Sequence, residues 1–451
     1  MKNLLITIFL APLLLTGCGI YKPYSRPEVE TDALYRDMPV QDTVSIASLS
    51  WRELFTDPAL QKLIDDALAQ NTDLRIAYLR VEAAKASLQS ARLAYVPAVS
   101  LNAEGGISHF KDSDAKTYSI GMNASWEVDI FGKLTASKRQ AFAALEETQA
   151  YQQAVQTQLI ATVADSYYSL LMLDEQLRIN KETCDNWTQT IRVLDALKHN
   201  GKTNEAALLQ AKANLLALEN AGAVLLSSIA QIENALSALL ATPSHSIERG
   251  SLNCLQFPDS ISTGVPVQLL ANRPDVRQAE FNLAKAYYAT NVARAAFYPT
   301  INLSGVFGWT NNGGGVIMNP GGWLANAIGS IVQPLFNRGV NKANLKIAKA
   351  NQEEALLLFR QSILDAGKEV NDALTQWQTA GQRIGKSSEQ IMLLEEAVRK
   401  TKLLMQHSDV SYLEVLTAQQ TLLDAQQSLI QDRFDKIQGV IHLYHALGGG
   451  V

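Results

Sequence analysis

The feature that most constrains this chain is one stretch that occurs twice, about 200 residues apart. The first copy, residues 91–106, reads ARLAYVPAVSLNAEGG, and the second copy, residues 293–308, reads ARAAFYPTINLSGVFG. In each copy a helical segment meets a proline, Pro97 or Pro299, and continues as an alternating strand. Because proline disfavours the α region at the residue before it, the helix has to end there in both copies. We therefore expect two domain-sized repeats, residues 51–264 and 265–451, rather than a solenoid of short repeats.

A pair of alternating strands follows each proline. We expect strands at about 98–110 and 117–128 in the first repeat, and at about 300–310 and 323–333 in the second. Each is about as long as a strand that crosses a bilayer at the tilt of a barrel. A half-buried hairpin of a soluble sheet alternates in the same way, so the strands alone leave both readings open. The last strand has the poorest pattern, because Asn326 and Ser330 interrupt its apolar side chains.

Long helices fill the rest of each repeat. In the first repeat an alanine-rich helix comes before the strands, and in the second its counterpart covers about 275–296. Coiled-coil hairpins are expected at about 133–241 and 340–447, with turns near Gly201 and Ser408. Their return helices have apolar residues at intervals of seven, which predicts left-handed coiled coils. Each half should thus contain one helix of about 100 Å and two of about 55 Å.

Four strands cannot close a membrane barrel, since the smallest such barrels have about eight. Lipid tolerates no open sheet edge, because unpaired backbone groups cannot be hydrated there. If the strands cross a membrane, the barrel has to be shared between chains: two chains would supply eight strands and three would supply twelve.

The first 17 residues are typical of an export signal. Lys2 supplies a positive charge, and an apolar run of about 12 residues follows, too short to span a bilayer as a helix. The run ends in Leu-Thr-Gly before Cys18, so we expect cleavage at this point and lipidation of the Cys18 thiol. An ordinary signal peptide with a chance cysteine, or a buried helix, would share the apolar run. Gly19, rather than an aspartate, directs the expectation to the outer membrane.

Residues 18–50 have three prolines and no clear period. We expect a lipidated, extended segment that wraps the body of the protein, with a disordered linker as the alternative.

The chain offers no catalytic constellation, and no cofactor is expected. Charged residues make up 18% of it and the net charge is −5, so nothing indicates nucleic-acid binding. His442 and His445 share a helix face, but a metal pair would lack a third ligand nearby in sequence. A disulfide between Cys184 and Cys254 is disfavoured, because the helix lengths place the two far apart.

Several motifs together resemble the TolC/OprM family of outer-membrane efflux channels, in its lipoprotein branch. The resemblance covers essentially the whole mature chain and rests on the segments Trp51 with Leu54-Phe55-Thr56-Asp57-Pro58, Asn71-Thr72-Asp73-Leu74, Asn272-Arg273-Pro274-Asp275-Val276 with Ala279-Glu280, and Tyr412-Leu413-Glu414-Val415-Leu416 with Ala418-Gln419.

The resemblance implies an α+β membrane protein. It is a homotrimer that shares a 12-stranded transmembrane β-barrel, four strands from each chain, continued by a long periplasmic α-helical barrel. The resemblance implies that the protein is not an enzyme. It would be the passive exit duct of a tripartite efflux pump of the RND type, which exports drugs or other toxic small molecules. The partners would be a periplasmic adaptor, an inner-membrane transporter and outer-membrane lipid. A structural coiled-coil envelope lipoprotein and a duct for type I protein secretion are the alternatives.

The resemblance also implies roles for single residues. The two hairpin turns, at Gly201 and Ser408, are candidates for adaptor docking, although the family often has glycine at both. Glu414 matches a position at which the family often carries an acidic periplasmic gate, whereas Thr417 stands at a second such position and has no charge.

Overall fold

The computed structural model describes residues 21–29, 34, 46, 49–111, 113–201, 203–252, 273–311, 322–407 and 412–450. The chain divides into two compact units, and each unit draws on both sequence repeats. Unit 1 comprises Met1–Val29, Leu79–Ala150 and Arg277–Gln361, and unit 2 comprises Glu30–Tyr78, Tyr151–Val276 and Ser362–Val451. The compact units therefore cut across the expected division at residue 264, because corresponding parts of the two repeats pack together.

The helices match in length between the repeats. Helix α5 (Lys133–His199) has 67 residues and α9 (Val340–His407) has 68, so each is about 100 Å long. The return helices α6 (Glu205–Leu239) and α10 (Tyr412–Ala446) have 35 residues each. Helices α4 (Thr72–Leu93) and α8 (Pro274–Ala295) have 22 residues each, about 33 Å. The bounds of α8 agree with those expected, about 275–296, but neither helix has the length of about 55 Å expected for the second short helix of each half.

Helix α4 is short because a separate helix precedes it. Helix α3 (Pro58–Gln70) ends at Asn71, whose side-chain oxygen accepts a hydrogen bond from the backbone N–H of Leu74, in the first turn of α4, at 3.0 Å. An asparagine that caps the following helix in this way begins a new helix, so the chain has two helices here rather than one.

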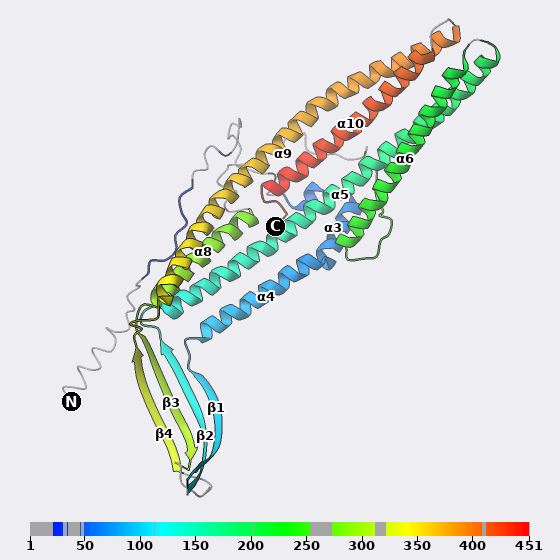
Figure 1. The fold of residues 1–451 in the computed structure, drawn as a ribbon. Helices are drawn as coiled ribbons and strands as arrows, with labels where there is room; N and C mark the ends of the chain where they lie inside the picture. Colours follow the sequence, from blue (N-terminus) through cyan, green and yellow to red (C-terminus); the bar gives the residue numbers. More distant parts are fainter. Residues whose placement is uncertain are drawn as a thin grey trace. The chain divides into compact units, whose positions relative to one another are not determined.

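Unit 1 contains a four-stranded antiparallel sheet in the order β1-β2-β3-β4 (Figure 1). The strands are β1 (Ala98–Phe110), β2 (Ser113–Val128), β3 (Thr300–Thr310) and β4 (Gly322–Val332). The second strand starts at Ser113 rather than near 117. Strands β2 and β3 come from different repeats and pair directly, so the two hairpins form one sheet.

Unit 1 also has a helical core, in which Val81 and Leu88 of α4 pack with Leu145 of α5. The N-terminal segment lies against α8, where Arg26 forms two hydrogen bonds with Glu280, at 2.7 and 2.6 Å. The rings of Tyr24 and Tyr287 pack edge to face, with their centroids 5.9 Å apart. The part of segment 18–50 that contains Tyr24 and Arg26 therefore packs against α8 in unit 1.

Unit 2 has an aromatic core around Phe55, which follows the short helix α2 (Trp51–Leu54) and is fully buried. Its ring centroid is 6.4 Å from that of Tyr168 and 6.3 Å from that of Tyr444. Asp57 caps α3 and also accepts a hydrogen bond from the hydroxyl of Tyr167 at 2.6 Å. These contacts give a packing reason for the Trp51-to-Pro58 motif.

Candidate functional site

One face of the sheet in unit 1 is apolar from edge to edge. The register aligns Leu101, Met122, Phe307 and Ala325 across the four strands. In this chain the side chains are exposed, with Leu101 72% and Ile107 77% accessible. The face consists of Val99, Leu101, Ala103, Gly105, Ile107, Tyr118, Ile120, Met122, Ala124, Trp126, Val128, Ile301, Leu303, Gly305, Phe307, Trp309, Trp323, Ala325, Ala327, Gly329 and Ile331. Such a surface needs an apolar environment, either lipid or another protein.

The opposite face is mainly polar. It carries Ser100, Asn102, Glu104, Ser108, Thr117, Ser119, Asn123, Ser125, Glu127, Asn302, Ser304, Thr310, Asn326 and Ser330, with small or apolar residues between them. One apolar face and one mainly polar face, formed by alternating residues of the strands, is the pattern of a barrel wall between lipid and a water-filled interior.

The expectation that Asn326 and Ser330 interrupt an apolar face was wrong. Asn326 pairs with Val306, and Ser330 pairs with Asn302, so both lie on the polar face. The apolar face of β4 is formed instead by every second residue from Trp323, namely Trp323, Ala325, Ala327, Gly329 and Ile331. Because β4 has large apolar residues at both sets of positions, its own sequence does not identify which set continues the apolar face of the sheet, and pairing with β3 decides it.

Both edges of the sheet are open. Strand β1 pairs on one side with β2, and β4 pairs on one side with β3, and the described residues contain no fifth strand. Their outer backbone groups therefore need partners from outside this sheet if the apolar face lies in lipid.

Aromatic side chains are concentrated on the apolar face. The ring centroids of Trp309 and Trp323 are 4.5 Å apart, and that of Phe307 lies 5.2 Å from Trp323. The indole of Trp126 donates to the backbone oxygen of Tyr95 at 3.0 Å, with the ring still 37% exposed. Amphipathic rings of this kind are enriched where a barrel wall meets the membrane surface.

The junction between β2 and α5 is fixed by polar contacts. Asp129 accepts hydrogen bonds from the backbone N–H groups of Leu134 and Thr135, at 2.9 and 2.8 Å, and from the Thr135 hydroxyl at 2.7 Å. Lys133 forms an ion pair with Glu127 at 3.0 Å. The carboxylate of Asp129 therefore caps α5, because it accepts hydrogen bonds from backbone N–H groups in the first turn of the helix.

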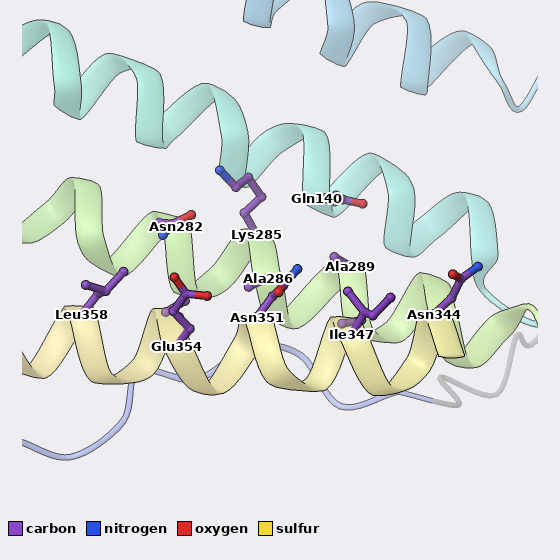
Figure 2. A pocket seen from close by; sticks show the side chains of 12 residues that line it. Gln140, Asn282, Lys285, Ala286, Ala289, Asn344, Ile347, Asn351, Glu354 and Leu358 are labelled. Carbon is purple, nitrogen blue, oxygen red and sulfur yellow. The ribbon is translucent and has the colours of Figure 1, made fainter. Parts of the chain in front are cut away.

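A groove of about 430 Å³ lies in unit 1 between α5, α8 and α9 (Figure 2). Its lining is largely alanine, asparagine and glutamine, with Glu354 and Lys285 as the charged residues. The ammonium group of Lys285 is already paired with Glu147 of α5 at 2.6 Å. The described lining contains no nucleophile next to a base, and so offers no catalytic arrangement.

The residues expected at the gate and the turns are only partly described. Gly201 has φ +72°, and a Cβ there would meet nothing within 4 Å, so glycine serves the turn itself. Glu414 and Thr417 are both exposed on α10, and the Thr417 hydroxyl donates to the backbone oxygen of Leu413 at 2.8 Å. In the described part of the chain, no hydrogen bond or ion pair joins Gly201, Glu414 and Thr417 to one another. Cys18 and Ser408 lie outside the described residues.

The two histidines of α10 have different surroundings. The Nε2 atom of His442 lies 3.0 Å from the Asp165 carboxylate, and this hydrogen bond raises the pKa of His442. Burial lowers the pKa of His445, and the charge of Arg273 lowers it further. Within the described ranges, no three His, Cys, Asp or Glu residues come close enough to hold a metal ion.

Arg273, which the motif alone singled out, turns out to join three segments of unit 2. It is 3% exposed and donates to Asp275, to Glu369 at 2.7 Å and to the backbone oxygen of Ala446 at 3.0 Å. These contacts tie the start of α8 to α9 and to the end of α10. The sequence places Asp275 in the same motif, but nothing in it indicated Glu369 or Ala446 as partners.

Of the two cysteines for which a disulfide was disfavoured, only Cys184 is described. It is a free thiol whose sulfur lies 3.9 Å from the side-chain oxygen of Asn180, while Cys254 lies outside the described residues.

Helix α6 is long and apolar enough to cross a membrane, and little of its most apolar stretch is buried in this chain. Leu209, Leu216 and Val224 are more than half exposed on it. An apolar helix of this kind needs a partner surface, but composition alone does not place it in lipid.

Comparison with known proteins identifies the family to which the chain is similar. The sequence model of the family described as "Outer membrane efflux protein" matches residues 63–242 and 265–449. The chain is 33% identical over 458 residues to the cation efflux system protein CusC of Escherichia coli K12, with 98% of each chain covered. It is 30% identical over 458 residues to the solvent efflux pump outer membrane protein SrpC of Pseudomonas putida, with 98% of this chain and 97% of SrpC covered.

The fold is likewise similar to solved structures. A crystal structure of CusC superimposes with a TM-score of 0.83 at 30% identity, covering 95% of this chain and 98% of that one. The open state of the MtrE outer membrane channel of Neisseria gonorrhoeae gives the same TM-score at 28% identity, covering 94% and 98%.

Proposed function

The chain belongs to the outer membrane efflux protein family and has the fold of its channels, and from this premise we propose that three copies form the passive exit duct of a tripartite pump. Each copy would contribute its four strands to a 12-stranded barrel and its long helices to a periplasmic tunnel. An inner-membrane transporter would supply the energy, and a periplasmic adaptor would join it to the duct. The duct needs no cofactor and performs no chemistry on its cargo.

The observation that carries this proposal is the sheet with one apolar face and two open edges. A single chain would leave backbone groups of β1 and β4 unpaired in lipid, at a cost of several kcal/mol for each group. Pairing β4 of one copy with β1 of the next removes both edges at once. Closure also places the polar face, with Asn102 and Asn123, around the interior, where it would be hydrated.

The exposed apolar residues of α6 support the same assembly. A coiled-coil hairpin that stood alone would leave Leu209, Leu216 and Val224 in water. Neighbouring copies in a closed ring of helices would cover them, in the manner of a coiled-coil seam. A brace made only of coiled coils would also cover these residues, but it would have no use for the sheet.

We propose that the cargo consists of small toxic solutes and that the transporter selects among them. CusC is named for cation efflux and SrpC for solvent efflux, so related ducts serve chemically different cargo. A wide, mainly polar barrel interior provides few contacts with which to discriminate. The turns at Gly201 and Ser408 are the candidate docking points for the adaptor.

Conductance of the purified full chain in planar bilayers tests the duct. We expect discrete channel currents, and native mass spectrometry in detergent should show three chains. A bilayer that stays sealed under all conditions, or a complex of two chains, would contradict the proposal.

Lipidation at Cys18 needs a separate test. Cys18→Ala should abolish metabolic labelling with a fatty acid but leave the exported protein in the outer membrane, because the barrel inserts independently of the anchor. A folded mutant found wholly soluble in the periplasm would contradict the barrel.

A further inference from the structure

A cavity of about 190 Å³ lies in unit 2 between α5, α9 and α10. Its apolar wall includes Ile179, Val398 and Leu423, all buried. The rest of its lining is mostly polar and includes Trp187 of α5 and Gln419 of α10, together with the charged side chains of Glu182, Glu395 and Lys402. The cavity is separate from the sheet and from the groove in unit 1.

Two buried polar atoms in this lining have no hydrogen-bond partner among the residues that the structure describes. They are the indole Nε1 of Trp187, which is 0% exposed, and the Oε1 of Gln419, which is 7% exposed. Leaving a buried donor or acceptor unpaired costs about 1–3 kcal/mol. Native interiors rarely retain such groups, and these two are complementary: one donates and the other accepts.

A hydroxyl group suits both atoms. Its oxygen accepts from the indole N–H, and its hydrogen donates to the amide oxygen. A charged ligand suits the site less well, because a cation would meet the positive edge of the indole and an anion would meet the amide oxygen. The apolar wall favours a hydroxyl carried by a hydrocarbon ring or chain.

We propose that this cavity binds a small neutral hydroxyl compound of the size of phenol, with its oxygen held between Trp187 and Gln419. A dry cavity of about 150 Å³ lined by apolar side chains already accepts benzene, so this volume leaves room for a ring and its hydroxyl. When no such solute is present, water oxygen takes the same place. The ligand joins α5 to α10 through one side chain from each.

Fluorine NMR of the full chain tests the site directly. The protein is labelled with 5-fluorotryptophan in detergent, and Trp187→Phe assigns the Trp187 resonance. Titration with phenol should shift this resonance saturably, while toluene, which has the ring but no hydroxyl, should not. Trp377 is a matched internal control, because its Nε1 is also buried with no partner in the described part of the chain, but Trp377 does not line the cavity.

Two variants make the result specific. Gln419→Leu removes the acceptor and should weaken phenol binding about fivefold, the equivalent of one neutral hydrogen bond. Gln420→Leu, at the exposed neighbouring position, should leave binding unchanged. An equal response to toluene, or undiminished binding by Gln419→Leu, would overturn the proposal. A Trp187 indole proton that exchanges magnetisation with water but ignores phenol would assign the place to water and overturn the organic ligand.

Discussion

The side chain of Asn180 covers Gly222 where α5 packs against α6. Asn180 is 2% exposed, and its amide donates to the backbone oxygen of Leu218 at 3.1 Å. A Cβ at Gly222 would lie 2.8 Å from the Asn180 side-chain oxygen, closer than packed atoms allow. The heptad pattern of α6 has leucine or isoleucine at the equivalent positions, so this glycine leaves space for a polar residue in the seam. A polar residue in a coiled-coil seam is a known means of fixing register.

Gly222→Val should therefore lower the unfolding free energy by about 2 kcal/mol, because overpacking a seam costs about 1–3 kcal/mol. Thermal unfolding in detergent measures it. Gly385→Ala in α9 is the matched control: a Cβ there meets nothing within 4 Å, so helix propensity should make it neutral or stabilising. Adding Asn180→Ala to Gly222→Val should recover part of the loss, whereas strictly additive effects would show that the two residues do not interact.

A second prediction separates the two faces of the sheet. Leu101 and Asn102 are neighbours on β1 but lie on opposite faces. If Leu101 faces lipid, Leu101→Arg should destabilise the protein in vesicles by about 2–4 kcal/mol near the bilayer centre. Asn102→Arg should insert normally and change the single-channel conductance. Equal effects of the two substitutions on insertion would mean that the apolar face does not contact lipid.

A third prediction concerns pH. The raised pKa of His442 adds stability that is complete below about pH 6.5 and is lost as the pH rises through this raised value. The lowered pKa of His445 acts in the opposite sense, because stability falls as the pH drops from about 6.5 through the lowered value. The thermal midpoint of unit 2 should consequently be highest near pH 6.5.

Variants distinguish the two limbs of this profile. Asp165→Asn removes the charged partner of His442 and should flatten the fall on the alkaline side. His445→Gln should flatten the fall on the acidic side, where a partly buried imidazole would otherwise have to become charged beside Arg273. If neither variant changes the pH profile, these histidines do not govern it.

A fourth prediction concerns the candidate gate. Glu414 and Thr417 are three residues apart on α10 and therefore neighbours on its surface. If that surface faces the tunnel, three copies of Glu414 form an acidic ring that attracts cations. Glu414→Gln should lower the cation preference of single channels, and Thr417→Asp, which adds a second ring, should raise it. Reversal potentials that neither substitution changes would remove both residues from the entrance.

Local patterns in the sequence identified most of the elements. Pro97 and Pro299 mark the ends of two helices because a proline restricts the residue before it, whatever the tertiary contacts are. The seven-residue spacing of the return helices, and the alternation in β1 to β3, likewise arise from the geometry of a single segment. Motif resemblance supplied the family, which the matches over residues 63–242 and 265–449 show independently.

The tertiary structure decided which surfaces meet. Pairing with β3 placed Asn326 and Ser330 on the polar face, although the sequence of β4 left either face possible. The partners of Arg273 lie about 100 and 170 residues further along the chain, and the cavity at Trp187 and Gln419 joins helices from both repeats. Periodicity is a property of one segment and determines helix or strand. Register, ion-pair partners and cavities depend on contacts between distant segments, and these exist only once the chain has folded.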